Sequence, residues 1–188
     1  MPRLFIAIDL SDAAKESIFL IQNGLRGARW IARENLHLTL RFIGEVSDVE
    51  ADDIHSTLSK VRSSSFVLKL RGAGVFSSGS RPRSAWIGVQ DRSPIVSLKG
   101  HIDRALASMG FGPDGRKYIP HVTVAKLKGR SSNITDFMPR LGSMPSISVE
   151  IEQFALFSSF LARAGPVYTR EMYYPLTVAS HKRILKVD

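Results

Sequence analysis

The chain contains one four-residue pattern twice: a histidine and a threonine two positions apart, with an aliphatic residue after each. The copies are His37-Leu38-Thr39-Leu40 and His121-Val122-Thr123-Val124. Side chains alternate across a β-strand, so the histidine and threonine of each copy face one side and the aliphatic residues face the other. A lone histidine in a strand is usually structural or solvated. Two histidines in the same context predict two imidazoles directed at one site.

The apolar periodicity around the copies predicts the same order of elements twice: strand, helix, His-Thr strand, helix, strand. Strands are expected at residues 3–9, 36–43, 66–70, 84–90, 118–127, 147–157 and 167–176. Helices are expected at about 11–26, 48–62, 94–109 and 133–141, the second with Val49, Ile54, Leu58 and Val61 inward. Residues 71–83, rich in glycine, serine and arginine, are expected to form a loop and the best internal boundary.

The repeated order predicts an internal duplication within a single domain spanning residues 1–188. Its halves are about 1–76 and 84–176, followed by a basic tail at 177–188. Duplicated halves commonly pack about a pseudo-two-fold axis, which would bring His37 and His121 face to face. We therefore expect an α+β fold of two lobes, each a mostly antiparallel sheet with helices on its outer face, and an active-site cleft between the lobes. A monomer is expected, because the duplication already supplies the second half-site.

The net charge of +9 and the sequence pI of about 10.2 favour a polyanionic partner. Part of this charge lies in the tail, where it could simply solvate a chain end. Other basic residues lie close in sequence to the candidate site, at Arg81, Arg83, Lys126, Lys128 and Arg130. The charge distribution therefore favours a phosphate-bearing ligand.

Several classes of protein are disfavoured by what the sequence lacks. There is no cysteine, which excludes disulfides, thiolate nucleophiles and cysteine metal sites. No apolar run reaches the ~18 residues of a membrane span, and the apolar start, broken by Asp9, is too short for a signal peptide. We therefore expect a cytoplasmic protein with no membrane partner.

Two facing imidazoles suit acid–base chemistry at phosphorus, because one can accept a proton while the other donates one. The threonine hydroxyls and a nearby cation would hold the non-bridging phosphate oxygens. No cofactor or metal is expected: there is no Walker A loop, no dinucleotide fingerprint and no acidic cluster beside the histidines. A zinc site would need a third ligand, and the sequence marks none.

Four segments, in order, resemble the LigT-like branch of the two-histidine phosphoesterases, over about residues 3–176. They are NLHLTLRFIGEV at 35–46, GAGVF at 72–76 with RPR at 81–83 and WIG at 86–88, PHVTVA at 120–125, and LFSS at 156–159 with GPVY at 165–168 and PL at 175–176. The resemblance implies a bilobal fold and an RNA 2',3'-cyclic phosphodiesterase. Such an enzyme opens a terminal 2',3'-cyclic phosphate to a 2'-phosphate, so that the 3' oxygen departs. The implied partner is an RNA with such an end, possibly a tRNA fragment.

The resemblance also implies roles for individual residues. His37 and His121 would be the catalytic pair, and Thr39 and Thr123 would hold the phosphate. By analogy, His121 would activate water as proton acceptor and His37 would protonate the 3' oxygen as proton donor. The pseudo-symmetry makes these two roles easy to exchange.

Lys126 departs from the family pattern, because relatives often carry arginine at this position, five residues after the second histidine. Lysine keeps the charge but lacks the bidentate fork that arginine offers a phosphate. In a regular strand Lys126 would point away from His121, so a bulge or the strand end would have to return it. Lys128 or Arg130 could take its place.

Further contacts are expected from residues close to the motifs. Arg41, Tyr118 and Arg130 are possible substrate contacts, and Tyr118 or Phe76 could line the cleft. Phe42 is expected in the core, on the side of Leu38 and Leu40.

Other functions stay open from the sequence. They are a 2'-5' RNA ligase, a name given to some relatives for joining tRNA halves, a phosphodiesterase for small nucleotides, and a non-catalytic RNA-binding or nucleotide-binding module. A bell-shaped dependence of rate on pH would separate an acid–base enzyme from a binder.

Overall fold

The computed structural model describes residues 1–115, 117–127, 133–162 and 165–178. Its strands are β1 (Arg3–Asp9), β2 (Ala28–Trp30), β3 (His37–Glu45), β4 (Phe66–Ser78), β5 (Arg81–Val89), β6 (His121–Leu127), β7 (Ile147–Ile151), β8 (Gln153–Ala162) and β9 (Gly165–Pro175). Its helices are α1 (Asp12–Leu20), α2 (Asp48–Leu58), α3 (Ser93–Ala107) and α4 (Ile134–Gly142), with a 3-10 turn η1 (Arg33–Asn35). No described helix is long and apolar enough to cross a membrane. Most of the predicted basic tail lies outside the described residues.

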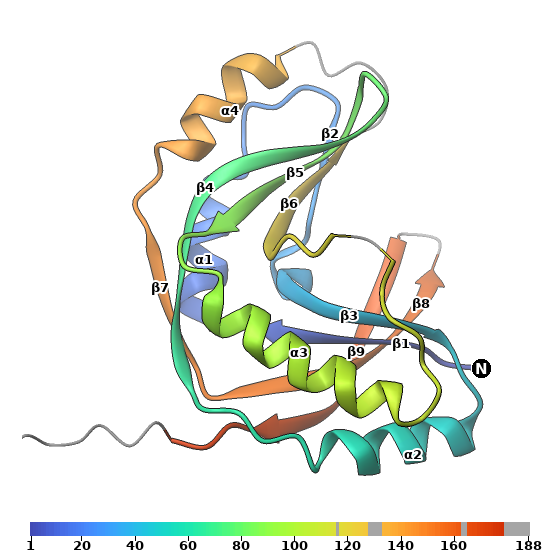
Figure 1. Cartoon of the computed structure of the whole chain (residues 1–188). Coiled ribbons are helices and arrows are strands. Elements are labelled where there is room, and N and C mark those ends of the chain that lie inside the picture. The colour runs from blue at the N-terminus through green and yellow to red at the C-terminus, as the bar shows by residue number, and fades with distance from the viewer. Residues whose placement is uncertain (116, 128–132, 163–164, 179–188) are drawn as a thin grey trace, which may run out of the picture.

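The strands pair antiparallel in the order β7-β4-β5-β6-β3-β1-β8-β9, and β2 pairs with β6. The order divides into two groups of four, β7-β4-β5-β6 and β3-β1-β8-β9, which Figure 1 shows as two arms of a curved sheet. The register between β3 and β6, where the groups meet, contains the single pair Leu38–Val122. The predicted α+β fold with two antiparallel lobes is confirmed.

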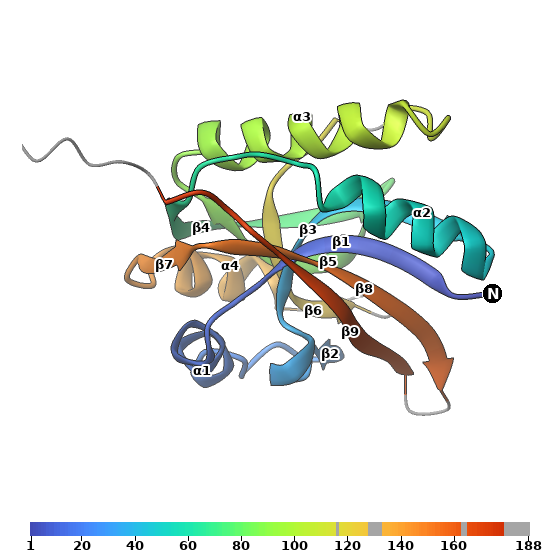
Figure 2. The same cartoon turned by 90° about the horizontal axis from the view of Figure 1, so that it is seen from below.

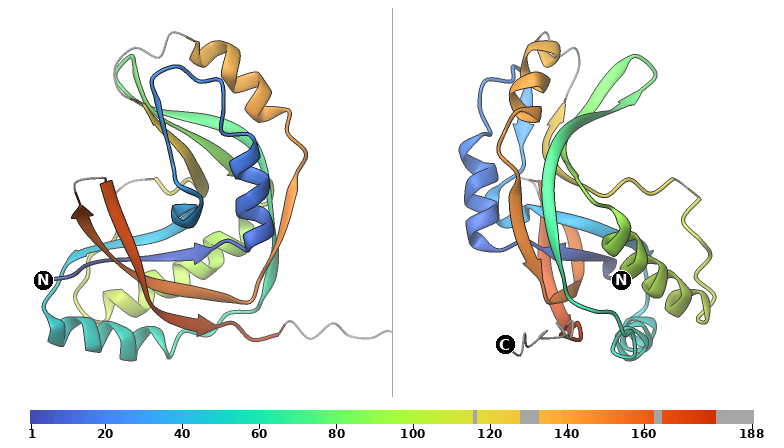
Figure 3. Two further views of the ribbon diagram at one scale, coloured as in Figure 1. Left: turned by 180° about the vertical axis from the view of Figure 1, so that it is seen from behind. Right: turned by 60° about the vertical axis from the view of Figure 1, so that its left-hand side comes forward.

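The two halves of the chain exchange strands. β4, from the first half, pairs with β5 and β7, whereas β8, from the second half, pairs with β1. Each arm therefore contains strands from both halves. The β4–β5 and β8–β9 hairpins end on the same side of the molecule (Figures 1 and 3).

The prediction of a boundary loop at residues 71–83 is wrong, because these residues form most of the β4–β5 hairpin. Two of its glycines have different roles, one in close packing and one in the turn. A β-carbon built on Gly74 would lie 2.0 Å from the Trp86 ring, so only glycine lets this ring cross β4. Gly79, with a φ of +57°, lies in the turn of the hairpin.

Several predicted boundaries also move. α1 ends at Leu20, earlier than expected, and the expected strand 147–157 divides into β7 and β8 at Glu152. β2 was not predicted. Val49 is 72% exposed rather than inward, although the capping box of Ser47 and Glu50 begins α2 where expected.

The core lies on the side of the sheet that the four helices cover. The inward residues of all four helices join one cluster with alternate residues of the central strands, such as Leu4, Ile6 and Ile8 of β1. Figure 2 shows α2 and α3 lying along this side. A smaller cluster on the opposite face contains Phe5, Ala7, Ala155 and Phe157, with Tyr168 packed against it.

Replacing Gly74 by alanine should destabilise the fold. The added methyl would overlap the Trp86 ring, and such overpacking typically costs about 1–3 kcal/mol. We expect a lower urea midpoint for Gly74→Ala. The control is Gly115→Ala, because a β-carbon there meets open space. Equal stability of the two variants would contradict this close packing.

Candidate active site

The two His-Thr motifs meet at the centre of the sheet. Leu38 and Val122 are paired across β3 and β6, and both are fully buried toward the core. By strand alternation, His37 and Thr39 of β3 therefore share the opposite face with the histidine and threonine of β6. We call this face, which carries His37, Thr39, His121 and Thr123, the motif face.

Both imidazoles are oriented by the same kind of hydrogen bond. Nδ1 of His37 lies 2.8 Å from the carbonyl oxygen of Asn35, and Nδ1 of His121 lies 2.7 Å from that of Ile119. A carbonyl can only accept, so each Nδ1 carries a proton and donates it. Each neutral ring therefore carries its lone pair on Nε2. Nε2 of His37 lies 3.1 Å from Oγ1 of Thr39, which can donate to it.

Aromatic rings surround both histidines. The ring centres of Phe5, Tyr168 and Phe157 lie 5.1, 5.3 and 6.1 Å from that of His37. Burial lowers the pKa of His37 from 6.5 to about 4, because it disfavours the charged imidazolium.

His121 has the rings of Phe76 and Trp86 beside it, at 4.7 and 5.8 Å. Burial lowers the pKa of His121 as well. Both imidazoles are therefore neutral near pH 7 in the free protein.

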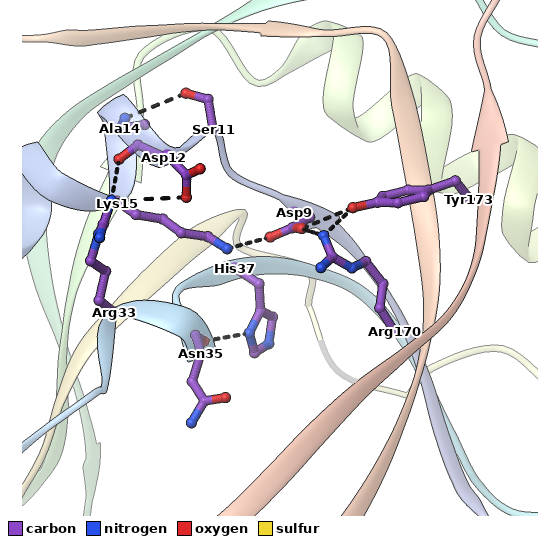
Figure 4. A network of polar contacts seen from close by, with 10 residues as sticks. All are labelled: Asp9, Ser11, Asp12, Ala14, Lys15, Arg33, Asn35, His37, Arg170 and Tyr173. Carbon is purple, nitrogen blue, oxygen red and sulfur yellow. Dashed lines mark hydrogen bonds and ion pairs between the residues drawn. The ribbon is translucent and has the colours of Figure 1, made fainter.

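An ionic network lies behind His37 (Figure 4). Asp9, at the end of β1, is the cross-strand partner of His37. Its carboxylate binds Nζ of Lys15 and a guanidinium nitrogen of Arg170, both at 2.6 Å, and the Tyr173 hydroxyl lies 3.3 Å away. The network ties α1, β1 and β9 together beside the motif face. Sequence reasoning missed it, because Arg170 is 161 residues from Asp9 along the chain.

The two histidines differ in their ionic neighbours. For His37, after burial and the bond to Asn35, the negative charge of Asp9 raises the pKa, partly offset by Lys15. For His121, after burial and the bond to Ile119, the positive charge of Lys126 lowers the pKa further. His37 therefore has a carboxylate among its charged neighbours that favours its protonated form, whereas the charged neighbour of His121 disfavours protonation.

Both motif strands contain a bulge one residue after the threonine. The β1–β3 register skips Leu40, and the β5–β6 register skips Val124. Two consecutive residues then face the core, Leu40-Arg41 in β3 and Val124-Ala125 in β6. The alternation is thereby reversed, and the next residue of each strand turns to the motif face.

The bulge in β6 turns Lys126 to the same face as His121. The sequence analysis required such a bulge, or the end of the strand, for Lys126 to reach the phosphate. The bulge in β3 does the same to Phe42, so its predicted place in the core is wrong. Phe42 is 68% exposed, and its ring centre lies 6.0 Å from that of Phe5.

Arg41 takes the core side instead, and the structure does not bring it to the motif face. It is buried, pairs with Asp103 of α3 at 3.4 Å and donates to the carbonyl of Gly112. The predicted substrate contact at Arg41 is therefore corrected to a bond between β3 and α3.

Tyr118 connects the two motifs through the backbone. Its hydroxyl donates to the carbonyl of Thr39 at 3.1 Å, across the junction between β6 and β3. Burial, with the charge of Asp103, raises the pKa of Tyr118, so the hydroxyl keeps the proton that it donates. The two other predicted contacts, Lys128 and Arg130, lie outside the described residues. Among the described residues, no three acidic or histidine side chains are grouped to hold a metal ion.

Comparison with known proteins identifies the family. The family described as LigT like Phosphoesterase matches twice, over residues 8–86 and 87–168. A protein of Aeropyrum pernix named RNA 2',3'-cyclic phosphodiesterase is 37% identical over 154 residues, or 80% of this chain and 86% of that protein. A protein of Archaeoglobus fulgidus with the same name is 31% identical over 169 residues, or 88% and 96%. Crystalline E. coli LigT complexed with 3'-AMP gives a TM-score of 0.77 at 27% identity, over 94% of this chain and 99% of that one. The chain belongs to the LigT-like phosphoesterases, as the sequence motifs predicted.

The buried, neutral state of His37 should make stability depend on pH. In the unfolded chain the pKa of His37 is 6.5, whereas in the folded chain it is about 4. Between these values the unfolded chain binds a proton that the folded chain does not, so the free energy of unfolding decreases as the pH falls. His37→Gln removes this group and should flatten the fall, by on the order of 1–3 kcal/mol. The measurement is the free energy of unfolding in urea at pH 7.5 and 4.5. Parallel pH dependence in wild type and variant would show that His37 is not held neutral.

Proposed function

We propose that the protein is an RNA 2',3'-cyclic phosphodiesterase that opens a terminal 2',3'-cyclic phosphate to a 2'-phosphate. The observation that carries the proposal is the pair of imidazoles, each fixed through Nδ1 by a backbone carbonyl and each followed by a threonine on the same face. The activity in the names of the Aeropyrum and Archaeoglobus relatives supports the proposal.

The reaction needs one proton acceptor and one proton donor on opposite sides of phosphorus. Nε2 of His121 takes a proton from water, and the water oxygen bonds to phosphorus. The bond from phosphorus to the 3' oxygen breaks as His37, protonated before the step, gives its Nε2 proton to that oxygen. Thr39, Thr123 and Lys126 hold the non-bridging oxygens, where charge develops.

The ionic neighbours support this assignment of roles. A bound phosphodiester anion raises the pKa of both imidazoles. Asp9 acts in the same direction on His37, whereas Lys126 opposes protonation of His121. We therefore assign His37 as donor and His121 as acceptor from the neighbouring charges alone, since burial lowers the pKa of both rings.

The substrate is proposed to be a nucleic acid chain rather than a free nucleotide alone. A net charge of +9 attracts a polyanion and predicts salt-sensitive binding. A single chain supplies both histidines, so residues 1–188 are proposed to act as one domain and as a monomer.

The first test is hydrolysis of a short RNA ending in a 2',3'-cyclic phosphate, with EDTA present. Wild type should leave a 2'-phosphate, and His37→Ala and His121→Ala should each lose activity by about 100-fold or more, because each removes one proton transfer. Circular dichroism checks that both variants fold. Turnover that survives both substitutions would refute the paired mechanism. Salt-sensitive RNA binding without turnover in wild type would favour a binding module.

Lys126 provides a second test. Lys126→Ala should reduce kcat/KM by about 10- to 100-fold, because a charge-assisted contact to phosphate is lost. Lys126→Arg should retain activity, because its guanidinium keeps the charge and adds a fork. The pKa of His121 should rise in Lys126→Ala, since the lysine lowers it, and the acidic limb of the rate profile should move to higher pH. Lys60→Ala, at an exposed lysine two residues after α2, is the control. An unchanged limb and unchanged kcat/KM would remove Lys126 from the phosphate site.

A further inference from the structure

β2, the short strand that the sequence did not predict, brings a second cation to the motif face. It pairs antiparallel with β6 in the register Ala28–Leu127, Arg29–Lys126 and Trp30–Ala125 (Figure 1). The first and last of these pairs pack against the core. By strand alternation, the middle pair of Arg29 and Lys126 faces the other way, onto the motif face, and both side chains are exposed.

The bulge in β6 also holds β2 in place. It leaves Val124 out of the β5–β6 register, and the carbonyl oxygen of Val124 accepts a bond from the backbone N–H of Ile31 at 3.0 Å. The same oxygen accepts from Nε2 of Gln22 at 3.0 Å, and this nitrogen also donates to the carbonyl of Ile31 at 2.9 Å. The backbone next to Arg29 is therefore tied to the bulge that turns Lys126 onto the motif face.

Arg29 lies on the side of β6 that faces the other arm. β5 occupies one edge of β6, so β2 pairs with the edge that also meets β3. The charge of Arg29 acts on β9 as well: burial raises the pKa of the Tyr168 hydroxyl, and Arg29 acts in the opposite direction. The Tyr168 ring centre lies 5.3 Å from that of His37. Arg29 is therefore opposite Lys126 on one arm and acts electrostatically on the residue beside His37 on the other.

We propose that Arg29, together with Lys126, binds the non-bridging oxygens of the reacting cyclic phosphate. This inference rests on the proposed function, which places phosphorus between Nε2 of His37 and Nε2 of His121. Like charges directly opposite each other across a strand pair repel, and a phosphate anion held between them offsets that repulsion. Lysine offers only a point charge, so the guanidinium of Arg29 supplies the planar fork that Lys126 lacks.

The pairing of the two cations suits one phosphate group. Residues directly opposite each other in an antiparallel pair have β-carbons about 4.5–5.5 Å apart, so the long side chains of Arg29 and Lys126 can converge on two oxygens of one phosphorus. A contact to these oxygens strengthens as charge develops on them in the transition state, and it should therefore contribute to kcat. A contact to a phosphate further along the RNA would instead improve only the binding of longer substrates.

The experiment compares two substrates that share the reacting phosphate. One is a nucleoside 2',3'-cyclic monophosphate, which contains no other phosphate. The other is a short RNA that ends in the same nucleotide and adds the phosphodiesters of the chain. The variants are Arg29→Ala and Arg29→Lys. Arg104→Ala is the matched control, because Arg104 is an exposed arginine of α3, on the opposite side of the sheet. Circular dichroism checks that all variants fold.

We expect Arg29→Ala to lose about 10- to 100-fold in kcat/KM on both substrates alike, with a fall in kcat, because a charge-assisted contact to the reacting oxygens is removed. Arg29→Lys should lose less, because it keeps the charge without the fork. Guanidinium ions at a non-denaturing concentration should restore part of the activity of Arg29→Ala, which they would not do if Arg29 were only structural. Arg104→Ala should stay within about 2-fold of wild type.

A loss confined to the short RNA would overturn the proposal, because Arg29 would then bind a phosphate of the chain rather than the reacting one. Equal losses in Arg29→Ala and Arg104→Ala would also overturn it, because net charge alone would then explain the effect, and so would full activity of Arg29→Ala. Failure of the proposed function is distinguishable, since wild type would then hydrolyse neither substrate.

Discussion

The cross-strand pair Leu38–Val122 joins the two arms of the sheet, and the placement of both histidines depends on it. β3 and β6 are aligned at this pair alone, whereas each is paired with its own arm along most of its length. The pair lies where the duplicated halves meet, so each motif supplies its histidine and threonine from either side of one point. Both residues are fully buried, and a slip of one residue would turn an imidazole into the core and a leucine or valine out of it. Burial of the apolar residues of each motif therefore fixes the face on which its histidine and threonine lie.

Local periodicity was sufficient to predict the motif face, because alternation in a strand is a local property. The duplication, the antiparallel arms and the four helices followed from the same patterns. The bulges could not be predicted in this way, because each is set by the partner strand, β1 for β3 and β5 for β6. Without the bulge, Phe42 falls in the core and Arg41 on the motif face, which is the reverse of the structure. For Lys126, the sequence analysis could say only that a bulge or the strand end would be needed to turn it toward His121.

Interactions between distant segments account for the remaining differences. The glycines in residues 71–83 predict a loop. Gly74 is instead required for packing, because the Trp86 ring lies against it once β4 and β5 pair. The network of Asp9 with Lys15 and Arg170 requires α1, β1 and β9 to converge, and no spacing in the sequence marks it. Both features lie immediately outside the motifs and act on the histidines within them.

A symmetric scaffold alone cannot direct the proposed reaction. Each imidazole is bonded through Nδ1 to a backbone carbonyl, and burial lowers the pKa of both, so these shared features do not assign the proposed roles of donor and acceptor. The proposed difference in role comes from positions at which the two copies of the motif differ. Asp9 lies behind one histidine and Lys126 beside the other, and their opposite charges separate two otherwise equivalent groups. The same kind of bulge brings Lys126 to the motif face beside His121 and Phe42 to the motif face on the side of His37, so the two sides of this face differ in charge and in apolar character.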